Sequence, residues 1–181
     1  MQLKIYLIFI IISIFPLSLK SENDFVQVKL NIKLDNNNII KIKSIGEDEI
    51  LQGTLFGKIE NLEDKNFNNA NLECDFIGRS YKGRGFSCGF AVIEDLQGLC
   101  YFRNNNNKDV LIANWNCNTT GGISGEAYCS GKLKIIQGFG DFAGTDGYGE
   151  VNIPLIKTIK SEISSPTKII LSIKYPMSLK K

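Results

Sequence analysis

The 181-residue sequence contains no histidine. This absence removes the side chain that most often serves as general base, as metal ligand and as a member of hydrolytic triads. The net charge is only +2, from 21 basic and 19 acidic residues, so no field of one sign attracts nucleic acid. We therefore expect no cofactor, no metal and no nucleic-acid partner, and the sequence identifies no catalytic residue.

Long helical patterns are also missing. No stretch sustains the 3.6-residue periodicity of an amphipathic helix, and 17 glycines argue against long helices. Instead, apolar and polar residues alternate from Val26 to Leu34, and turn signals recur at short intervals along the chain. The sequence therefore predicts an all-β fold. We expect an antiparallel barrel of about eight strands, because closure removes exposed edges, with a β-sandwich as the alternative.

Individual elements follow from these patterns. Residues 25–45 predict a β-hairpin whose turn is the polar cluster at 35–38, and residues 51–59 predict the next strand. The charged and asparagine-rich stretch at 61–71 predicts a surface loop or a short helix. Residues 95–98 predict a turn. A last strand at 168–175 is expected either to complete the barrel or to pair across an interface.

No apolar run reaches the roughly 20 residues that a spanning helix needs. The longest, residues 5–15, follows Lys4 and is closed by Pro16, which is typical of a secretory signal peptide. We expect a signal peptide at 1–21, ending near Ser21, and a single all-β domain at 22–181 in the periplasm or outside the cell. No transmembrane span is expected after cleavage. Retention of the segment as an anchor is the alternative.

All five cysteines lie in the part of the chain that is expected to be exported, where disulfides persist. If residues 71–78 pair with 84–93, Cys74 and Cys88 lie opposite each other at a separation that suits a disulfide. A turn centred on Ile123 brings Cys117 and Cys129 together in the same way. Cys100 is then predicted to be an unpaired, buried thiol.

A glycine-rich segment lies between two β-prone runs and predicts a tight corner between two strands; its glycines are Gly138, Gly140, Gly144, Gly147 and Gly149. Residues 138–143 also match G-x-G-x-x-A, but a dinucleotide site needs a helix there, which the later glycines disfavour. The same segment contains four side chains with oxygen atoms that could bind calcium: Asp141, Thr145, Asp146 and Glu150. Solvated turn residues are the simpler interpretation of these side chains.

Other polar and aromatic residues carry weaker signals. The adjacent carboxylates at 47–49 and 94–95 fall in predicted turns, where a catalytic pair is seldom found. The aromatic side chains are expected to fill the core; they include Phe86, Phe90, Tyr101, Trp115, Phe139, Phe142 and Tyr148. None of these residues is assigned a catalytic role.

Several motifs occur in a familiar order over residues 83–153: Gly85-Phe86-Ser87-Cys88, Trp115-Asn116-Cys117, Cys129-Ser130-Gly131 and the glycine segment. This order resembles uncharacterised exported bacterial proteins of the allene oxide cyclase and dirigent-like barrel type. Their signature is Gly-Thr-Gly-x-Phe-x-Gly-x-x-Gly-x-Gly, and Phe139 stands here where threonine is usual. The resemblance implies an eight-stranded antiparallel barrel with an apolar interior, which Phe142 plugs. It transfers no catalytic residue.

These observations favour a non-enzymatic exported barrel that binds a small apolar molecule or an envelope component. A second hypothesis is an isomerase or cyclase that holds a reactive apolar substrate in one conformation. A third is a structural or interaction module whose terminal strands pair with a partner or with another copy. Homo-oligomerisation therefore stays open.

Overall fold

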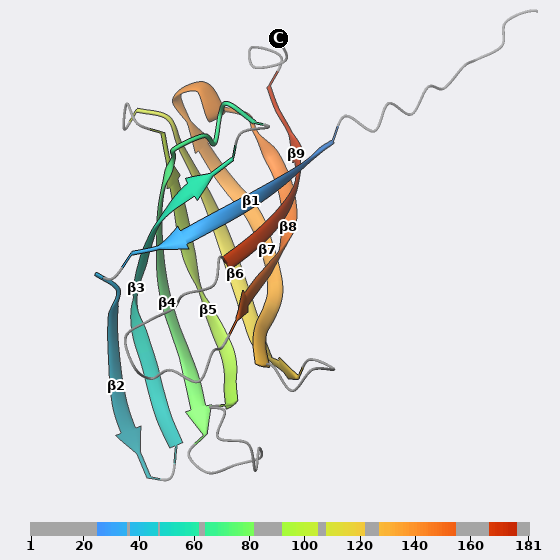
Figure 1. The fold of residues 1–181 in the computed structure, drawn as a ribbon. Coiled ribbons are helices and arrows are strands. Elements are labelled where there is room, and N and C mark those ends of the chain that lie inside the picture. The colour runs from blue at the N-terminus through green and yellow to red at the C-terminus, as the bar shows by residue number, and fades with distance from the viewer. Residues whose placement is uncertain are drawn as a thin grey trace, which may run out of the picture.

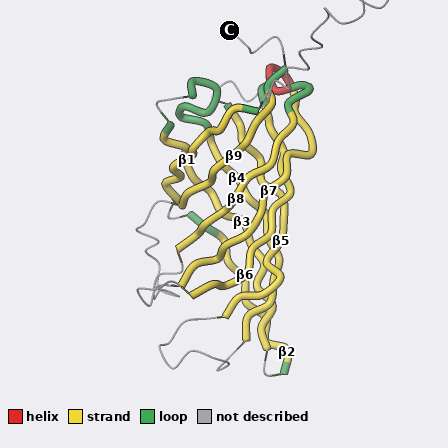
Figure 2. Tube along the Cα trace, turned by 90° about the vertical axis from the view of Figure 1, so that its right-hand side faces the viewer, coloured by secondary structure: helices red, strands yellow, loops and turns green. Residues whose placement is uncertain are grey.

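The computed structural model describes residues 25–35, 37–46, 48–61, 64–81, 92–104, 108–121, 127–154 and 167–176. The predicted signal peptide and Cys88 lie outside these ranges. The described residues form nine strands: β1 (Val26–Leu34), β2 (Ile39–Ile45), β3 (Asp48–Glu60), β4 (Asn71–Tyr81), β5 (Val92–Arg103), β6 (Val110–Gly121), β7 (Ala127–Phe139), β8 (Asp146–Pro154) and β9 (Thr167–Lys174). The 3₁₀ turn η2 (Gly140–Phe142) joins β7 to β8 (Figure 2). The fold is all-β, as predicted.

The nine strands form one antiparallel sheet that closes in a ring. The order is β1-β9-β8-β7-β6-β5-β4-β3, and β1 also pairs with β3, which closes the ring (Figure 1). The closing contact joins Asn31 to Glu60 and Leu34 to Gly57 at its two ends. β2 lies outside the ring and extends the sheet beyond β3. Among the described strands, residues 26–30 of β1 and the whole of β2 therefore lack a strand partner on one side.

The hairpin predicted over 25–45 is wrong. β1 and β2 each pair antiparallel with β3, so they run in the same direction, and the described strands show no β1–β2 pairing. Between them, the Asp35 amide donates to the Phe56 carbonyl at 2.8 Å, and the Phe56 amide donates to Oδ1 of Asn38 at 2.7 Å. The polar cluster therefore stays bonded to the long strand β3 and does not reverse the chain.

The turn predicted at 95–98 is also wrong. These residues lie inside β5, where the pairing with β4 shifts by one residue between Ile77 and Arg79. Asp95 adopts a positive φ of 51° at this bulge, a conformation that aspartate tolerates better than most residues. Asp95 therefore lies in a β-bulge, and β5 continues through it.

The segment after β3 is a loop, one of the two alternatives predicted, but part of it is buried. Residues 65–69 form turns, and Phe67 within them is fully buried. The Ile59 amide donates to the Ala70 carbonyl at 2.9 Å, and the Asn69 amide donates to the Ile59 carbonyl at 3.1 Å, which folds the loop back onto β3. The loop thus places an aromatic side chain in the core.

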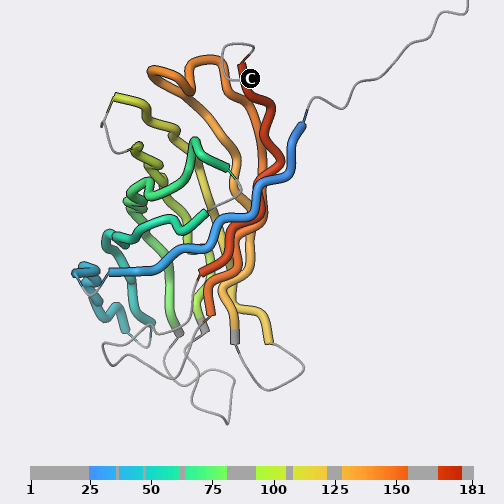
Figure 3. The backbone as a smooth tube through the Cα atoms, turned by 45° about the horizontal axis from the view of Figure 1, so that its top comes forward, coloured from blue at the N-terminus to red at the C-terminus, as the bar shows by residue number. Residues whose placement is uncertain are grey.

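β9 completes the ring, which decides between the two roles expected for the last strand. It pairs with β8 on one side and with β1 on the other, from Val26–Ile173 to Ile32–Thr167 (Figure 3). Its inward residues Ile169, Leu171 and Ile173 are at most 3% exposed. Among the described residues, no helix is long and apolar enough to cross a membrane.

Candidate functional site: an apolar cavity inside the ring

Alternate residues of each ring strand face a common apolar interior. The clearest example is β9, where buried and more exposed positions alternate along the strand. β1 does the same with Val28, Leu30 and Ile32 buried. Because neighbouring strands are in register, these inward residues form one continuous core.

Aromatic side chains close the end of the ring that lies next to η2. Phe142 of η2 is only 2% exposed, and its ring centroid lies 5.5 Å from that of Phe67. Phe67 in turn meets Phe102 of β5 edge to face, with centroids 6.0 Å apart. Burial of three phenylalanines seals this end by the hydrophobic effect. Phe142 is therefore part of the seal at this end.

The five glycines of the predicted corner lie at the β7–η2–β8 connection. Gly140 and Gly144 have φ angles of 62° and 82°, which favour glycine. A Cβ on Gly138 would lie 1.9 Å from the Phe142 carbonyl oxygen, so glycine is also required there by close approach. Gly147 and Gly149 alternate along β8 with Tyr148, which is 60% exposed.

Two of the aromatic residues expected in the core are therefore on the surface. Because the glycines of β8 take the inward positions, Tyr148 points outward and packs against Phe25 with ring centroids 5.8 Å apart. Phe139, at the end of β7, is 49% exposed. Trp115 is buried as expected. Phe86 and Phe90 lie outside the described residues.

A disulfide bonds Cys74 of β4 to Cys100 of β5, which are directly opposed, with Cα atoms 4.0 Å apart. The predicted bond between Cys74 and Cys88 and the predicted unpaired thiol at Cys100 are therefore wrong. The reason is the register: β4 continues to Tyr81 and β5 begins only at Val92, so the partner of Cys74 lies further along the chain.

The second disulfide bonds Cys117 of β6 to Cys129 of β7, the pair expected from the sequence, with Cα atoms 5.3 Å apart. The strands are offset from the predicted register, since Cys129 directly opposes Thr119 and Cys117 opposes Gly131. The bond therefore runs diagonally between the strands.

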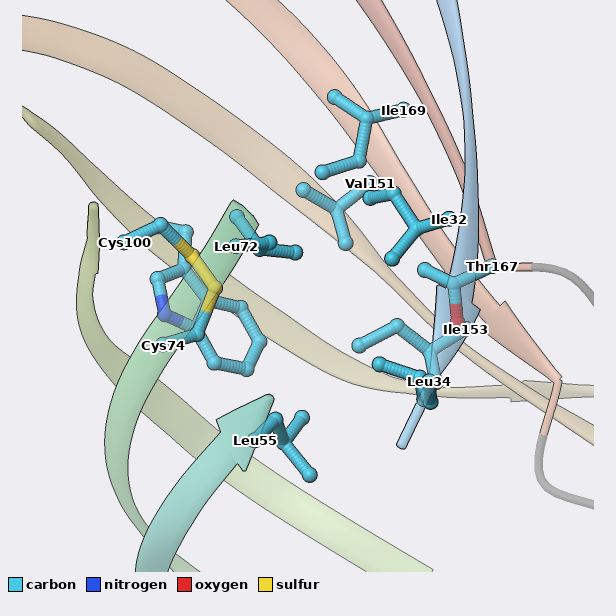
Figure 4. A pocket seen from close by; sticks show the side chains of 11 residues that line it. Ile32, Leu34, Leu55, Leu72, Cys74, Cys100, Val151, Ile153, Thr167 and Ile169 are labelled. Atoms are coloured by element: carbon cyan, nitrogen blue, oxygen red, sulfur yellow. A yellow bond between two sulfur atoms is a disulfide. The ribbon is translucent and has the colours of Figure 1, made fainter. Parts of the chain in front are cut away.

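A small cavity lies inside the ring, toward the end of β8 and β9 that is distant from η2 (Figure 4). Its volume is about 20 Å³, which exceeds the roughly 10–15 Å³ that one water-sized group needs. Its lining comes from seven strands: Ile32, Leu34, Leu55, Leu72, Cys74, Cys100, Trp115, Val151, Ile153, Thr167 and Ile169. Leu34, Leu55 and Ile153 are only partly buried, so they mark the side that opens to solvent.

The cavity wall is apolar and lacks an ionisable side chain. Both of its cysteines are joined in the Cys74–Cys100 disulfide and do not titrate. Among the lining residues only Trp115 and Thr167 have a side-chain nitrogen or oxygen, and neither atom is exposed to the cavity. The arrangement can therefore hold an apolar group away from water, but the described lining offers no general acid or base.

The polar residues considered for a calcium site do not converge. The Oδ1 atom of Asp146 accepts from the Gly147 amide at 2.8 Å, while Asp141 and Glu150 are exposed. Among the described residues, no group of three or more acidic or cysteine side chains could hold a metal ion. The Asp141 amide donates to Oδ1 of buried Asp109 at 2.9 Å, which ties the corner to the start of β6.

One buried polar contact fastens the closed end. The Tyr175 hydroxyl, just after β9, donates to Oδ2 of Asp64 in the loop that follows β3. Burial, and then the hydrogen bond and the negative charge of Asp64, raise the pKa of Tyr175 well above its usual range. The tyrosine therefore remains a neutral donor at physiological pH.

The cavity could not be found from local sequence patterns, because its wall combines single residues from strands far apart in the chain. The only local signal was the alternation that predicted which residues of 26–34 face inward. In comparisons with known proteins, no family model matches the chain, and no curated protein matches its sequence. The geometry of the ring and its cavity is therefore the basis for assigning a function.

Proposed function

We propose that this protein binds a small apolar molecule, or one end of a larger apolar molecule, inside the ring. The observation that carries the proposal is the cavity wall, in which nine of the eleven lining residues have no side-chain nitrogen or oxygen and none is charged. Such a wall binds apolar groups by removing them from water, at about 25 cal/mol per Å². The partly exposed side chains of Leu34, Leu55 and Ile153 form the entrance.

The shape of the ring supports the same proposal. One end is sealed by Phe67 and Phe142, whereas the cavity opens toward the other end. A ring of about eight strands is wide enough to be filled by side chains or to hold one small ligand. The small cavity volume selects narrow ligands, such as an alkyl chain or the end of an isoprenoid.

We also propose export to the periplasm or the cell exterior, with residues 1–21 as the signal peptide. The two disulfides are compatible with an oxidising compartment. The closed antiparallel ring and the glycine corner support placement among barrels of the allene oxide cyclase and dirigent-like type. An enzymatic role in acid–base chemistry has less support, because the described cavity wall contains no carboxylate.

The experiment is a binding screen by native mass spectrometry and thermal shift with alkyl chains, isoprenoids and lipids. Leu55→Trp fills the entrance and should weaken binding at least tenfold. Ile77→Trp is the matched control, because Ile77 is 49% exposed on β4 and does not line the cavity. The proposal fails if the wild type binds none of these ligands or if both variants bind as the wild type does.

A further inference from the structure

Strand β2 presents an edge beside the closed ring (Figure 1). All seven of its residues, Ile39–Ile45, are exposed, and among the described strands it pairs only with β3. In an antiparallel pair, alternate residues turn their backbone N–H and C=O groups away from the partner, so the far side of β2 offers a row of donors and acceptors to a further strand. None of the cavity-lining residues belongs to β2, so this edge is separate from the proposed ligand site.

The two faces of β2 differ in chemistry. Ile42 is paired with Leu51 of β3, which packs against the core, so Ile40 and Ile42 lie on the face toward the ring interior. The exposed fractions of these two isoleucines are 51% and 48%. Lys41 and Lys43 lie on the opposite, outer face. A strand added to β2 would therefore meet apolar side chains on one face and positive charge on the other.

The positive charge of the outer face has no acidic partner within the described part of the chain. Lys41 and Lys43 are exposed and make no ion pair with another described residue. The residues paired with them on β3 are Gln52 and Ile50, and neither is acidic. Asp48, a carboxylate on this face of β3, lies at the first position of that strand. A facing strand with carboxylates at alternate positions would therefore complement both lysines.

We propose that β2 binds an extended segment of a partner protein in which acidic residues alternate with apolar ones, and that this segment adds a strand to the sheet. The backbone of the segment pairs with the edge of β2, which supplies affinity without regard to sequence. Its carboxylates face Lys41 and Lys43, and its apolar side chains cover Ile40 and Ile42. These alternating contacts supply the specificity.

Two other occupants fit this edge less well. In a symmetric antiparallel pair of two copies centred on Ile42, Lys41 of each copy lies opposite Lys43 of the other, and like charges in these positions destabilise the pair. A flat lipid surface against the lysine face would leave the isoleucines of the opposite face uncovered. The acidic strand, in contrast, uses the edge and both faces of β2.

The probes are fluorescein-labelled synthetic peptides, titrated with the full protein while fluorescence anisotropy is recorded. The test peptide has the core Val-Glu-Val-Glu-Val. A lysine peptide, Val-Lys-Val-Lys-Val, reverses its charge, and a scrambled peptide, Glu-Glu-Val-Val-Val, keeps its composition without the alternation. A version of the test peptide that is methylated at every backbone nitrogen keeps the side chains but cannot donate to β2.

We expect the glutamate peptide to bind the wild type most tightly. The lysine peptide should bind roughly two- to thirtyfold more weakly, the range of two cross-strand charge pairs. The scrambled peptide should also bind more weakly, and the methylated peptide should not bind. When the glutamate peptide binds, amide hydrogen exchange should slow at alternate residues of β2 and stay unchanged in β7.

Lys41→Glu/Lys43→Glu should reverse the preference, so that the lysine peptide binds more tightly than the glutamate peptide. Lys132→Glu/Lys134→Glu is the matched control and should keep the wild-type preference. Its two exposed lysines are also two residues apart, but they lie on β7, which pairs with β6 and β8. If the β2 variant does not fold, the peptide series on the wild type carries the test.

Equal binding of the glutamate and lysine peptides, an unchanged preference in Lys41→Glu/Lys43→Glu, or undiminished binding of the methylated peptide would overturn the proposal. Absence of binding by every peptide would overturn it as well. In that case, binding to phosphatidylglycerol vesicles that Lys41→Glu/Lys43→Glu abolishes would identify a lipid surface as the occupant. A wild-type molar mass that rises with concentration would identify a second copy.

Discussion

The disulfide pattern gives the most direct test of the fold. The structure bonds Cys74 to Cys100 and Cys117 to Cys129, with sequence separations of 26 and 12 residues. In the chain-entropy model, loops of these lengths stabilise the fold by about 3.5 and about 2.8 kcal/mol. The loops do not overlap, so together they contribute about 6 kcal/mol, a large part of the roughly 5–15 kcal/mol that stabilises a typical domain.

The perturbation is the paired replacement Cys74→Ala/Cys100→Ala, compared with Cys117→Ala/Cys129→Ala and with Cys88→Ser as the control. Urea unfolding followed by circular dichroism should show losses of about 3.5 and 2.8 kcal/mol for the two pairs. The control should retain both disulfides and unfold close to the wild type. Peptide mapping without reduction should recover the same two bonds in the wild type. A Cys74–Cys88 peptide, or an unchanged stability of Cys74→Ala/Cys100→Ala, would refute the β4–β5 register.

Three further predictions concern the closed end of the ring and the exposed edge of β2. Phe142→Ala should lower the free energy of unfolding, measured by thermal unfolding, by about 3–5 kcal/mol. Phe139→Ala, at an exposed position, should change it by no more than about 0.5 kcal/mol. Equal losses for the two variants would contradict the burial of Phe142 at the sealed end. Because the pKa of Tyr175 is raised in the fold, the unfolded tyrosine loses its proton first, near pH 10, and stability falls as pH rises above that value. The stability advantage of the wild type over Tyr175→Phe should therefore shrink by about 1.4 kcal/mol per pH unit above pH 10, and a constant difference would contradict this cause. Lys41→Thr/Lys43→Thr should raise the molar mass measured by light scattering at high protein concentration, because lysines on an exposed edge strand oppose pairing with another copy. An unchanged molar mass would show that these lysines do not prevent pairing at β2.

The sequence predicted the fold class and many strands, because alternation and turn residues are local signals. Residues 26–34 illustrate this: their alternation correctly predicted the buried face of β1. The partner of that strand was not predictable in the same way. β1 pairs with β9 and β3, and this pairing depends on the length of β3 and on the closure of the whole ring.

The other errors arise where a local signal misleads or is missing. Asp95 and Gly98 look like a turn, but Asp95 lies in a bulge within β5, and the partner of Cys74 was misplaced because β5 begins only at Val92. Phe67 lies among polar residues without periodicity, so its burial left no pattern to detect. The cavity wall left no local pattern either, since its residues come from seven strands that are brought together only when the ring closes.

The position of β1 also affects when the protein can fold. Val26, in the first described strand, is bonded through the ladder to Ile173 in the last one. Because the chain is synthesised from its N-terminus, β1 has no β9 to pair with until β9 has been made. Contacts between residues so far apart in the sequence also form slowly. The ring therefore closes only after β9 has been synthesised. Its unpaired strand edges need protection from aggregation until then.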